Sequence, residues 1–249
     1  MVSTRKTALV AGVLFLITFA ASIPAAFYFY EPVLNNANYI LGGAADSRVA
    51  WGALLEVILV ITGIGTAVVL YPVVKRQNEG IALGYVAART IESAVIAVGI
   101  ISLLSLVTLR ESLAGAAGAA SSTALGQALV AVHDWTFLMG PGFMVAVGNG
   151  MLLGYLMYRS GLVPRGMAML GLIGGPLLFV SSIAVLFDVW EQTSTVAFGF
   201  AAFEIAWELS LGVYLTFKGF RKAGLQKLGF EPVESAATTG SPMELRPAA

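Results

Sequence analysis

Seven ionisable side chains lie within stretches of this sequence that are otherwise almost entirely apolar. They are Glu56, Arg89, Glu92, His133, Asp134, Glu204 and Glu208. A charged side chain inside a bilayer is costly unless it is paired or faces water, so such residues commonly mark a pathway or a binding site. If these stretches span a membrane, the seven residues are candidates to bind a proton, a cation or a small polar ligand.

Spacing along the chain indicates which of these side chains can meet. Arg89 and Glu92 are three residues apart, so they lie on one face of a helix and can form an ion pair. Glu204 and Glu208 are four residues apart and also share a face. Two carboxyl groups so close together in a low dielectric should rarely both be ionised. We therefore expect one of this second pair to hold a proton near neutral pH.

The rise of a helix places most of the seven residues at one depth. Counted from the predicted outer boundary at about 1.5 Å per residue, this level is roughly 10–13 Å deep. It contains Glu56, Glu92, His133, Asp134 and Glu204. Arg89 and Glu208 lie about one turn deeper. Four different segments contribute these residues, which predicts a single buried polar site.

Each group also has a purely structural interpretation. Arg89 and Glu92 can form an ion pair that only fixes helix packing, and His133 can be a neutral, hydrogen-bonded core residue. One imidazole with carboxylates would suit iron, manganese or zinc. However, the chain has a single histidine, no cysteine and no paired Glu-x-x-His spacing. We therefore assign no metal ligand and no cofactor.

The composition identifies the solvent of these segments. Hydrophobic residues make up 58% of the 249 positions, charged residues only 11%, and the mean hydropathy is +0.85. Soluble domains carry about 25% charged residues. The composition thus excludes a soluble enzyme and a disordered protein, and a net charge of zero gives no basic field for nucleic acid. The lipid bilayer is the one partner that the sequence predicts directly.

The apolar runs predict an all-α fold, a polytopic six-helix transmembrane bundle. The expected spans are residues 8–30, 49–74, 81–109, 125–158, 166–187 and 196–217, since about 20 apolar residues cross the hydrocarbon. Strands are excluded because the runs are continuous rather than alternating. The fourth span would be about 51 Å long as a straight helix, and Pro141-Gly142 near its middle should kink or break it.

The distribution of Lys and Arg predicts the orientation. Basic residues gather before the first span, after the second and sixth, and between the fourth and fifth. The positive-inside rule then places both termini in the cytoplasm. Residues 1–7 form the cytoplasmic N-terminus, 8–217 the membrane domain, and 218–249 a disordered cytoplasmic tail. Within the spans, Gly150-x-x-x-Gly154 and Gly171-x-x-x-Gly175 predict grooves for close helix approach.

Several short motifs occur along the chain in an order that can be compared with known families. They are Arg5-Lys6-Thr7-Ala8, Leu70-Tyr71-Pro72, Arg89-x-x-Glu92, His133-Asp134, Gly154-Tyr155, Tyr158-Arg159-Ser160-Gly161 and Pro164-Arg165. In this order the chain resembles the bacterial and archaeal multi-pass proteins grouped as "domain of unknown function 4386", over residues 5–217. The resemblance implies an integral membrane protein of about six helices. It implies no established activity and no catalytic residues.

Three classes of function stay open at this point. The polar cluster can bind or help transport a proton, a cation or a small polar ligand. It can belong to a membrane-embedded enzyme that uses a metal or a lipid substrate, although the sequence leans away from an enzyme. It can also simply lock six helices together in a structural or signalling protein. The sequence names no ligand and no oligomeric state.

Overall fold

The computed structural model describes residues 4–42, 46–113 and 122–230, and every regular element within these ranges is helical. Six helices are long and apolar enough to cross a membrane. They are Thr4–Phe29, Ser47–Val74, Glu79–Ser112, Thr123–Ser160, Arg165–Leu186 and Thr195–Phe217. The predicted all-α fold with six spans is confirmed for the described part of the chain.

Some spans consist of more than one element. The first joins α1 (Thr4–Pro24) to the π-helix η1 (Ala25–Phe29), and the fourth joins α5 (Thr123–Phe137), η4 (Leu138–Met144), η5 (Ala146–Leu153) and α6 (Gly154–Ser160). The other spans are α3 (Ser47–Val74), α4 (Glu79–Ser112), α7 (Arg165–Leu186) and α8 (Thr195–Phe217). Three short helices complete the fold: α2 (Glu31–Leu34), η2 (Tyr39–Leu41) and α9 (Lys222–Lys227).

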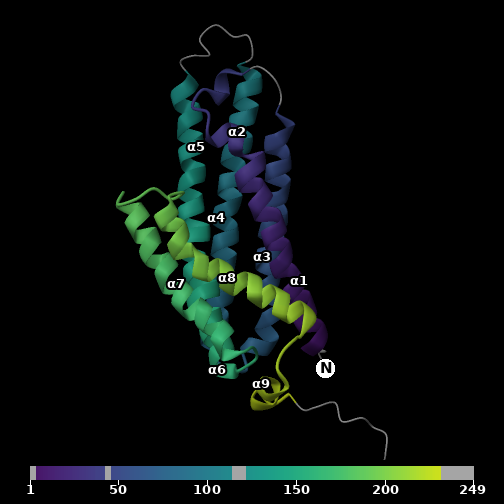
Figure 1. The fold of residues 1–249 in the computed structure, drawn as a ribbon. Coiled ribbons are helices and arrows are strands. Elements are labelled where there is room, and N and C mark those ends of the chain that lie inside the picture. Colours follow the sequence, from purple (N-terminus) through teal and green to yellow (C-terminus); the bar gives the residue numbers. More distant parts are fainter. Residues whose placement is uncertain (1–3, 43–45, 114–121, 231–249) are drawn as a thin grey trace, which may run out of the picture.

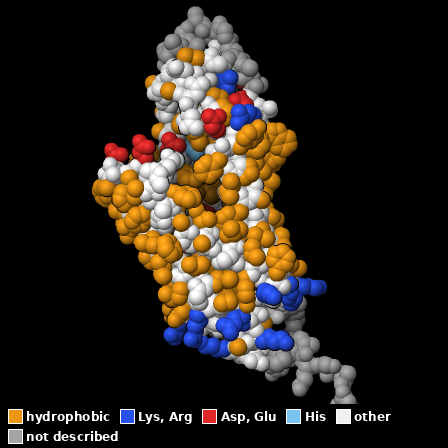
Figure 2. Space-filling model, in the orientation of Figure 1, with side chains coloured by type: hydrophobic (Ala, Val, Ile, Leu, Met, Phe, Trp, Pro, Cys, Tyr) orange, Lys and Arg blue, Asp and Glu red, His pale blue; other side chains and the backbone are white. Residues whose placement is uncertain are grey.

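The six spans form a closed ring in chain order. Each span packs on the next, and α8 packs back on α1. In Figure 1 the bundle is elongated, and α8 is steeply inclined: it meets α1 near the end that carries the N-terminus and lies beside α7 at its other end. We call the end with the N-terminus and α9 the basic end, because Figure 2 shows a band of Lys and Arg there. The opposite end is called the far end.

Specific caps fix several helix ends. Asp46 accepts a hydrogen bond from the backbone N–H of Arg48 at the start of α3, and Asn78 accepts one from Ile81 at the start of α4. At the basic end, the guanidinium of Arg5 donates to the backbone oxygens of residues 215, 216 and 217, at 3.1, 2.9 and 3.3 Å. These are orphan carbonyls at the C-terminus of α8, so Arg5 closes the ring there.

Glycines permit the closest helix crossing. A Cβ at Gly150 would collide with the Cα of Gly175, and one at Gly154 would lie 3.2 Å from the backbone nitrogen of Leu172. At Gly171 a Cβ would meet the indole ring of Trp207 at 2.7 Å. The grooves predicted from the glycine spacing are therefore present, and they bring η5, α7 and α8 together.

The fourth span is not broken at Pro141. The chain runs as one helix from Thr123 to Ser160, and the region around the proline winds as the π-helices η4 and η5. Of the two expected outcomes, a kink or a break, the break is therefore wrong. Proline removes one N–H from the ladder, and the wider i→i+5 turn accommodates this loss without ending the helix.

The two ends of the chain also differ from expectation. Helix α1 begins at Thr4, inside the predicted N-terminal segment, and residues 222–227 of the predicted disordered tail form α9. The backbone N–H of Arg221 donates to the oxygen of Leu162 at 2.8 Å, which ties this segment to the turn after α6. The rest of the predicted tail, residues 231–249, lies outside the described residues.

The spans differ greatly in length, and this decides where the polar residues lie. Helix α4 has 34 residues and the fourth span 38, against 22 and 23 for α7 and α8. At 1.5 Å per residue these are about 51, 57, 33 and 35 Å. Only α7 and α8 match about 30 Å of hydrocarbon. The far ends of α4 and α5 therefore rise beyond the α7–α8 turn, as Figure 1 shows, and carry α2 and η2 on a second apolar core.

Candidate functional site

The seven candidate residues fall into two groups rather than one. The central cluster combines α4, η5 and α8 and contains Arg89, Glu92, Asn149, Glu204 and Glu208. The far-end cluster combines the end of η1, α3 and α5 and contains Tyr30, Glu56, His133 and Asp134. Asn149 and Tyr30 are members that the sequence analysis did not select.

The core of the central cluster is a buried ion pair. An Nη1 of Arg89 lies 2.6 Å from Oε2 of Glu92, and both residues are buried. The Nε of Arg89 also donates to the backbone oxygen of Gly63 in α3 at 3.3 Å. The pair that the three-residue spacing predicts is present, and the arginine uses a second donor to join α4 to α3.

Asn149 connects the fourth span to α8. Its side-chain amide donates to Oε1 of Glu208 at 2.5 Å, while its backbone oxygen accepts from the indole N–H of Trp207 at 2.9 Å. Asn149 is fully buried. The signal in the sequence that could have identified it is a lone amide side chain between two glycines in an apolar run.

Glu204 is the unpartnered member of the central cluster. It is 2% exposed, and neither carboxyl oxygen has a hydrogen-bond partner in the described part of the chain. Glycines make the space that its carboxyl group occupies: a Cβ at Gly150 would lie 2.7 Å from its Oε2, and one at Gly174 would meet its backbone nitrogen at 2.7 Å. The carboxyl group is within electrostatic range of Glu92, Glu208 and Arg89. The close crossing of helices at these glycines thus places the carboxyl group of Glu204 against the backbone of the neighbouring helices.

The charges of the central cluster do not balance. Three carboxyl groups, those of Glu92, Glu204 and Glu208, surround the single guanidinium of Arg89. If all were ionised, two negative charges would stay uncompensated in a low-dielectric interior. Like charges in such surroundings force one group into its neutral form.

The far-end cluster is built around Tyr30. Its hydroxyl donates to Oε2 of Glu56 at 2.9 Å, and its ring meets the imidazole of His133 edge-to-face with centroids 5.5 Å apart. A Cβ at Gly52 would lie 2.5 Å from this ring, so the glycine makes room for it. His133 is buried, and its Nδ1 has no hydrogen-bond partner among the described residues, the nearest carboxyl oxygen being that of Asp134 at 3.6 Å.

Asp134 faces away from the buried part of this cluster. Its side chain is 60% exposed and borders a pocket of about 360 Å³ between the α2–η2 segment and the far ends of α4 and α5. Above it, Tyr39 donates to Asp46, which also pairs with Arg110 at 3.6 Å. Burial, and then the hydrogen bond to Asp46, raise the pKa of Tyr39 to about 12. Tyr39 therefore stays a hydrogen-bond donor at neutral pH and links η2 to Asp46 at the start of α3.

The expectation of one polar level is wrong for a geometric reason. Ala53, Ile96 and Ile100, each one or two helical turns from Glu56 or Glu92 along α3 or α4, form a small apolar core of their own. The depth count assumed that every span starts at the same boundary, whereas α4 and α5 extend well beyond the α7–α8 turn. His133 therefore lies nearer the far end than Glu204 does. Consistently, among the described residues no three His, Asp or Glu side chains are placed to hold a metal ion.

Comparison with known proteins defines the class to which this chain belongs. The fold and the intramembrane charges are those of a multi-pass integral membrane protein. The family model described as "Domain of unknown function (DUF4386)" matches residues 10–219, so the chain belongs to that family. Searches of the curated proteins and of the solved structures gave no match.

Proposed function

We propose that this chain is a protein of the prokaryotic plasma membrane whose central cluster takes up and releases a proton at Glu204. The observation that supports this most directly is the carboxyl group of Glu204, which is buried, unpartnered and adjacent to two further carboxyl groups. Intramembrane acids in such positions serve as proton relays in pumps and transporters. Proton-linked binding or transport is therefore the class of function we propose.

The partners of the three carboxyl groups decide which one carries the proton. Glu92 has the guanidinium of Arg89, and Glu208 has the amide of Asn149. Among the residues that the structure describes, Glu204 has neither a cation nor a donor in contact. An isolated ionised carboxylate in an apolar interior is so costly that such a group neutralises instead. We therefore expect Glu204 to be neutral in the state that the structure represents.

Release of this proton would disturb the ion pair on α4. A new negative charge on Glu204 would compete with Glu92 for Arg89, the single cation of the cluster. Arg89 would then shift towards α8, and α4 and α8 would be drawn together. Proton release at Glu204 is thus expected to be coupled to the packing of these two helices.

A purely structural cluster would have a different pattern of contacts. Buried polar groups that serve only stability are almost always hydrogen-bonded. Here both carboxyl oxygens of Glu204 and the Oδ1 of Asn149 are buried without a partner in the described ranges. Unsatisfied acceptors at one point of the bundle favour a site that receives a proton.

Infrared difference spectroscopy of the purified protein in lipid tests the proposal. Between about pH 5 and pH 8 we expect the carbonyl band of a protonated carboxyl group to change. The band should be lost in Glu204→Gln and retained in Glu208→Gln, which is the matched control one turn away. A spectrum without a changing carboxyl band, or a band that survives Glu204→Gln, would overturn the assignment.

A further inference from the structure

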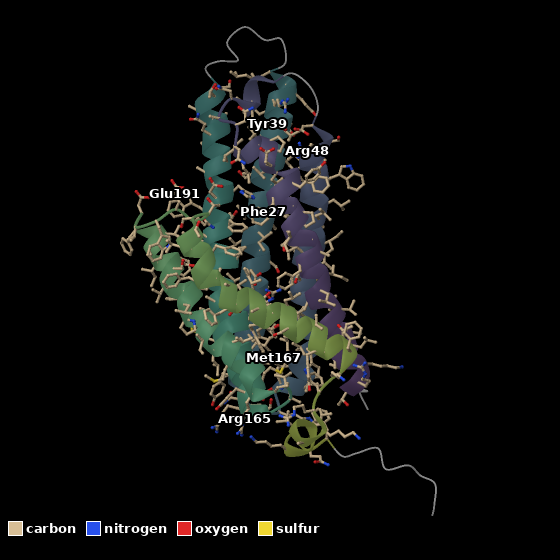
Figure 3. All side chains as sticks on the ribbon, in the orientation of Figure 1. Phe27, Tyr39, Arg48, Arg165, Met167 and Glu191 are labelled. Carbon is tan, nitrogen blue, oxygen red and sulfur yellow. The ribbon has the colours of Figure 1, made fainter. Side chains whose placement is uncertain are left out.

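A third polar feature, separate from the central and far-end clusters, lies at the basic end. It is a pocket of about 340 Å³ at the turn between α6 and α7, covered on one side by α9. Four of the residues that line it are basic and none is acidic. They are Arg159, Arg165, Arg221 and Lys227. Figure 3 shows Arg165 at this end of the bundle.

The backbone brings these four cations together. Gly161 has φ 71°, a left-handed conformation that ends α6 and turns the chain towards α7. A Cβ at Gly224 would lie 2.6 Å from the backbone oxygen of Gly161, so the glycine lets α9 pack directly on the turn. The ammonium of Lys227 donates to the backbone oxygen of Arg159 at 2.5 Å. In this way α9 places Arg221 and Lys227 across from Arg159 and Arg165.

The three arginines of the pocket make fewer contacts than other arginines at the same end: in the described ranges their guanidinium groups have a single ring contact, that of Arg165 with Tyr158 at 5.8 Å from the ring centroid. Arg5 donates to the end of α8, and Arg76 donates to the backbone oxygens of residues 228 and 229 and stacks on Phe230. By contrast, no hydrogen bond or ion pair from the guanidinium groups of the pocket is found within residues 4–42, 46–113 and 122–230. A general excess of positive charge does not explain why the unpaired guanidinium groups border one pocket.

The start of α7 adds to the positive potential of the pocket. Helix α7 has 22 residues, and Pro164 at its N-cap provides no side-chain cap. The first turn of such a helix carries a partial positive charge that favours anions. A Cβ at Gly166 would meet nothing within 4 Å, so the space beside this turn is open.

From these observations we infer that the pocket binds the phosphate headgroup of an anionic phospholipid. Guanidinium groups bind phosphate oxygens in charge-assisted, often bidentate hydrogen bonds. The pocket lies where two spans end, at Ser160 and Arg165, and therefore at the depth of the lipid headgroups. Basic pockets between transmembrane helices are typical sites for anionic headgroups. A lipid already in the leaflet reaches this place without leaving the membrane.

The test measures phosphatidylglycerol binding to the full chain in nanodiscs of phosphatidylcholine. We expect Arg159→Gln with Arg165→Gln to weaken binding by at least about tenfold, because two charge-assisted contacts are lost. Lys6→Gln with Lys218→Gln is the matched control, since it removes the same charge from exposed positions of the same end. The control should bind as the unmodified protein does.

Three outcomes would overturn the inference. Equal weakening in the control would show that only general surface charge attracts the lipid. Unweakened binding in both double variants, equal to that of the unmodified protein, would show that the pocket is not the site. Inorganic phosphate that stabilises the protein against thermal unfolding to the same extent as phosphatidylglycerol would show that the ligand is a free anion. If the pocket variant does not fold, Arg221→Gln replaces it, because this exposed side chain makes no hydrogen bond or ion pair with the described residues.

Discussion

Arg89 is the single cation beside the three carboxyl groups of the central cluster, and its removal should destabilise the protein more than removal of any other charge of this cluster. We expect Arg89→Leu to destabilise the protein by about 3–5 kcal/mol, because Glu92 is left as an uncompensated buried charge. The Arg89→Leu, Glu92→Leu double variant should be more stable than the single one. The midpoint of thermal unfolding in detergent measures both. A double variant that loses the sum of the two single losses would show that the residues do not pair.

Asn149 offers a second test at the same scale. Asn149→Ala removes the donor to Glu208, and we expect a loss of about 1 kcal/mol because a partly buried carboxyl group loses its hydrogen bond. Gln127→Ala is the control, since Gln127 is an exposed side chain in the same span. Equal thermal midpoints for the two variants would contradict the role given to Asn149.

Single residues could be predicted from the sequence only where a local rule applied. The Arg89–Glu92 pair follows from the geometry of one helix, and so does the nearness of Glu204 to Glu208. Glu56 and Glu92 lie in different clusters because α4 and α5 extend beyond the other helices along the bundle axis. No local spacing in the sequence specifies this offset. Asn149 is paired with Glu208 only because two glycine-rich helices approach closely.

At the scale of elements, the crossing of η5 with α7 controls the central cluster. Gly150→Ala places a methyl group against the backbone of Gly175 and against the carboxyl group of Glu204. Overpacking of this kind costs about 1–3 kcal/mol. Gly199→Ala is the matched control, because a Cβ there meets nothing within 4 Å and alanine favours the helix by up to about 1 kcal/mol.

Thermal midpoints of the two glycine variants distinguish a tight crossing from a general sensitivity of glycines. The midpoint of Gly150→Ala should fall, and that of Gly199→Ala should stay level or rise. If the methyl group at position 150 is tolerated, the helices are not in the close contact described.

The sequence predicted the elements better than it predicted their interior geometry. Continuous apolar runs define six helices, and small residues at four-residue spacing define the crossing faces. Pro141 shows the limit of this reasoning. A missing N–H can end a helix, kink it or widen it, and the choice depends on the neighbouring helices that supply packing around η4 and η5.

The orientation of the whole molecule is still a prediction, made from the asymmetry of Lys and Arg. Reporter fusions at Gln77, at Gly118 and after the last residue should read cytoplasmic, external and cytoplasmic, because loops rich in basic residues stay inside. An external C-terminus would contradict the assignment. That result would leave the six-helix fold unaffected and would place the basic pocket in the external leaflet.

The hydrogen bonds between Arg5 and the end of α8 have a consequence for biosynthesis. The first acceptor, the backbone oxygen of Leu215, is made 210 residues after the donor. Until then α1 can rest on α3 alone, with its second side open to lipid or to the insertion machinery. A nascent chain stopped before Leu215 therefore lacks the hydrogen bonds by which Arg5 joins the first helix to the end of the last.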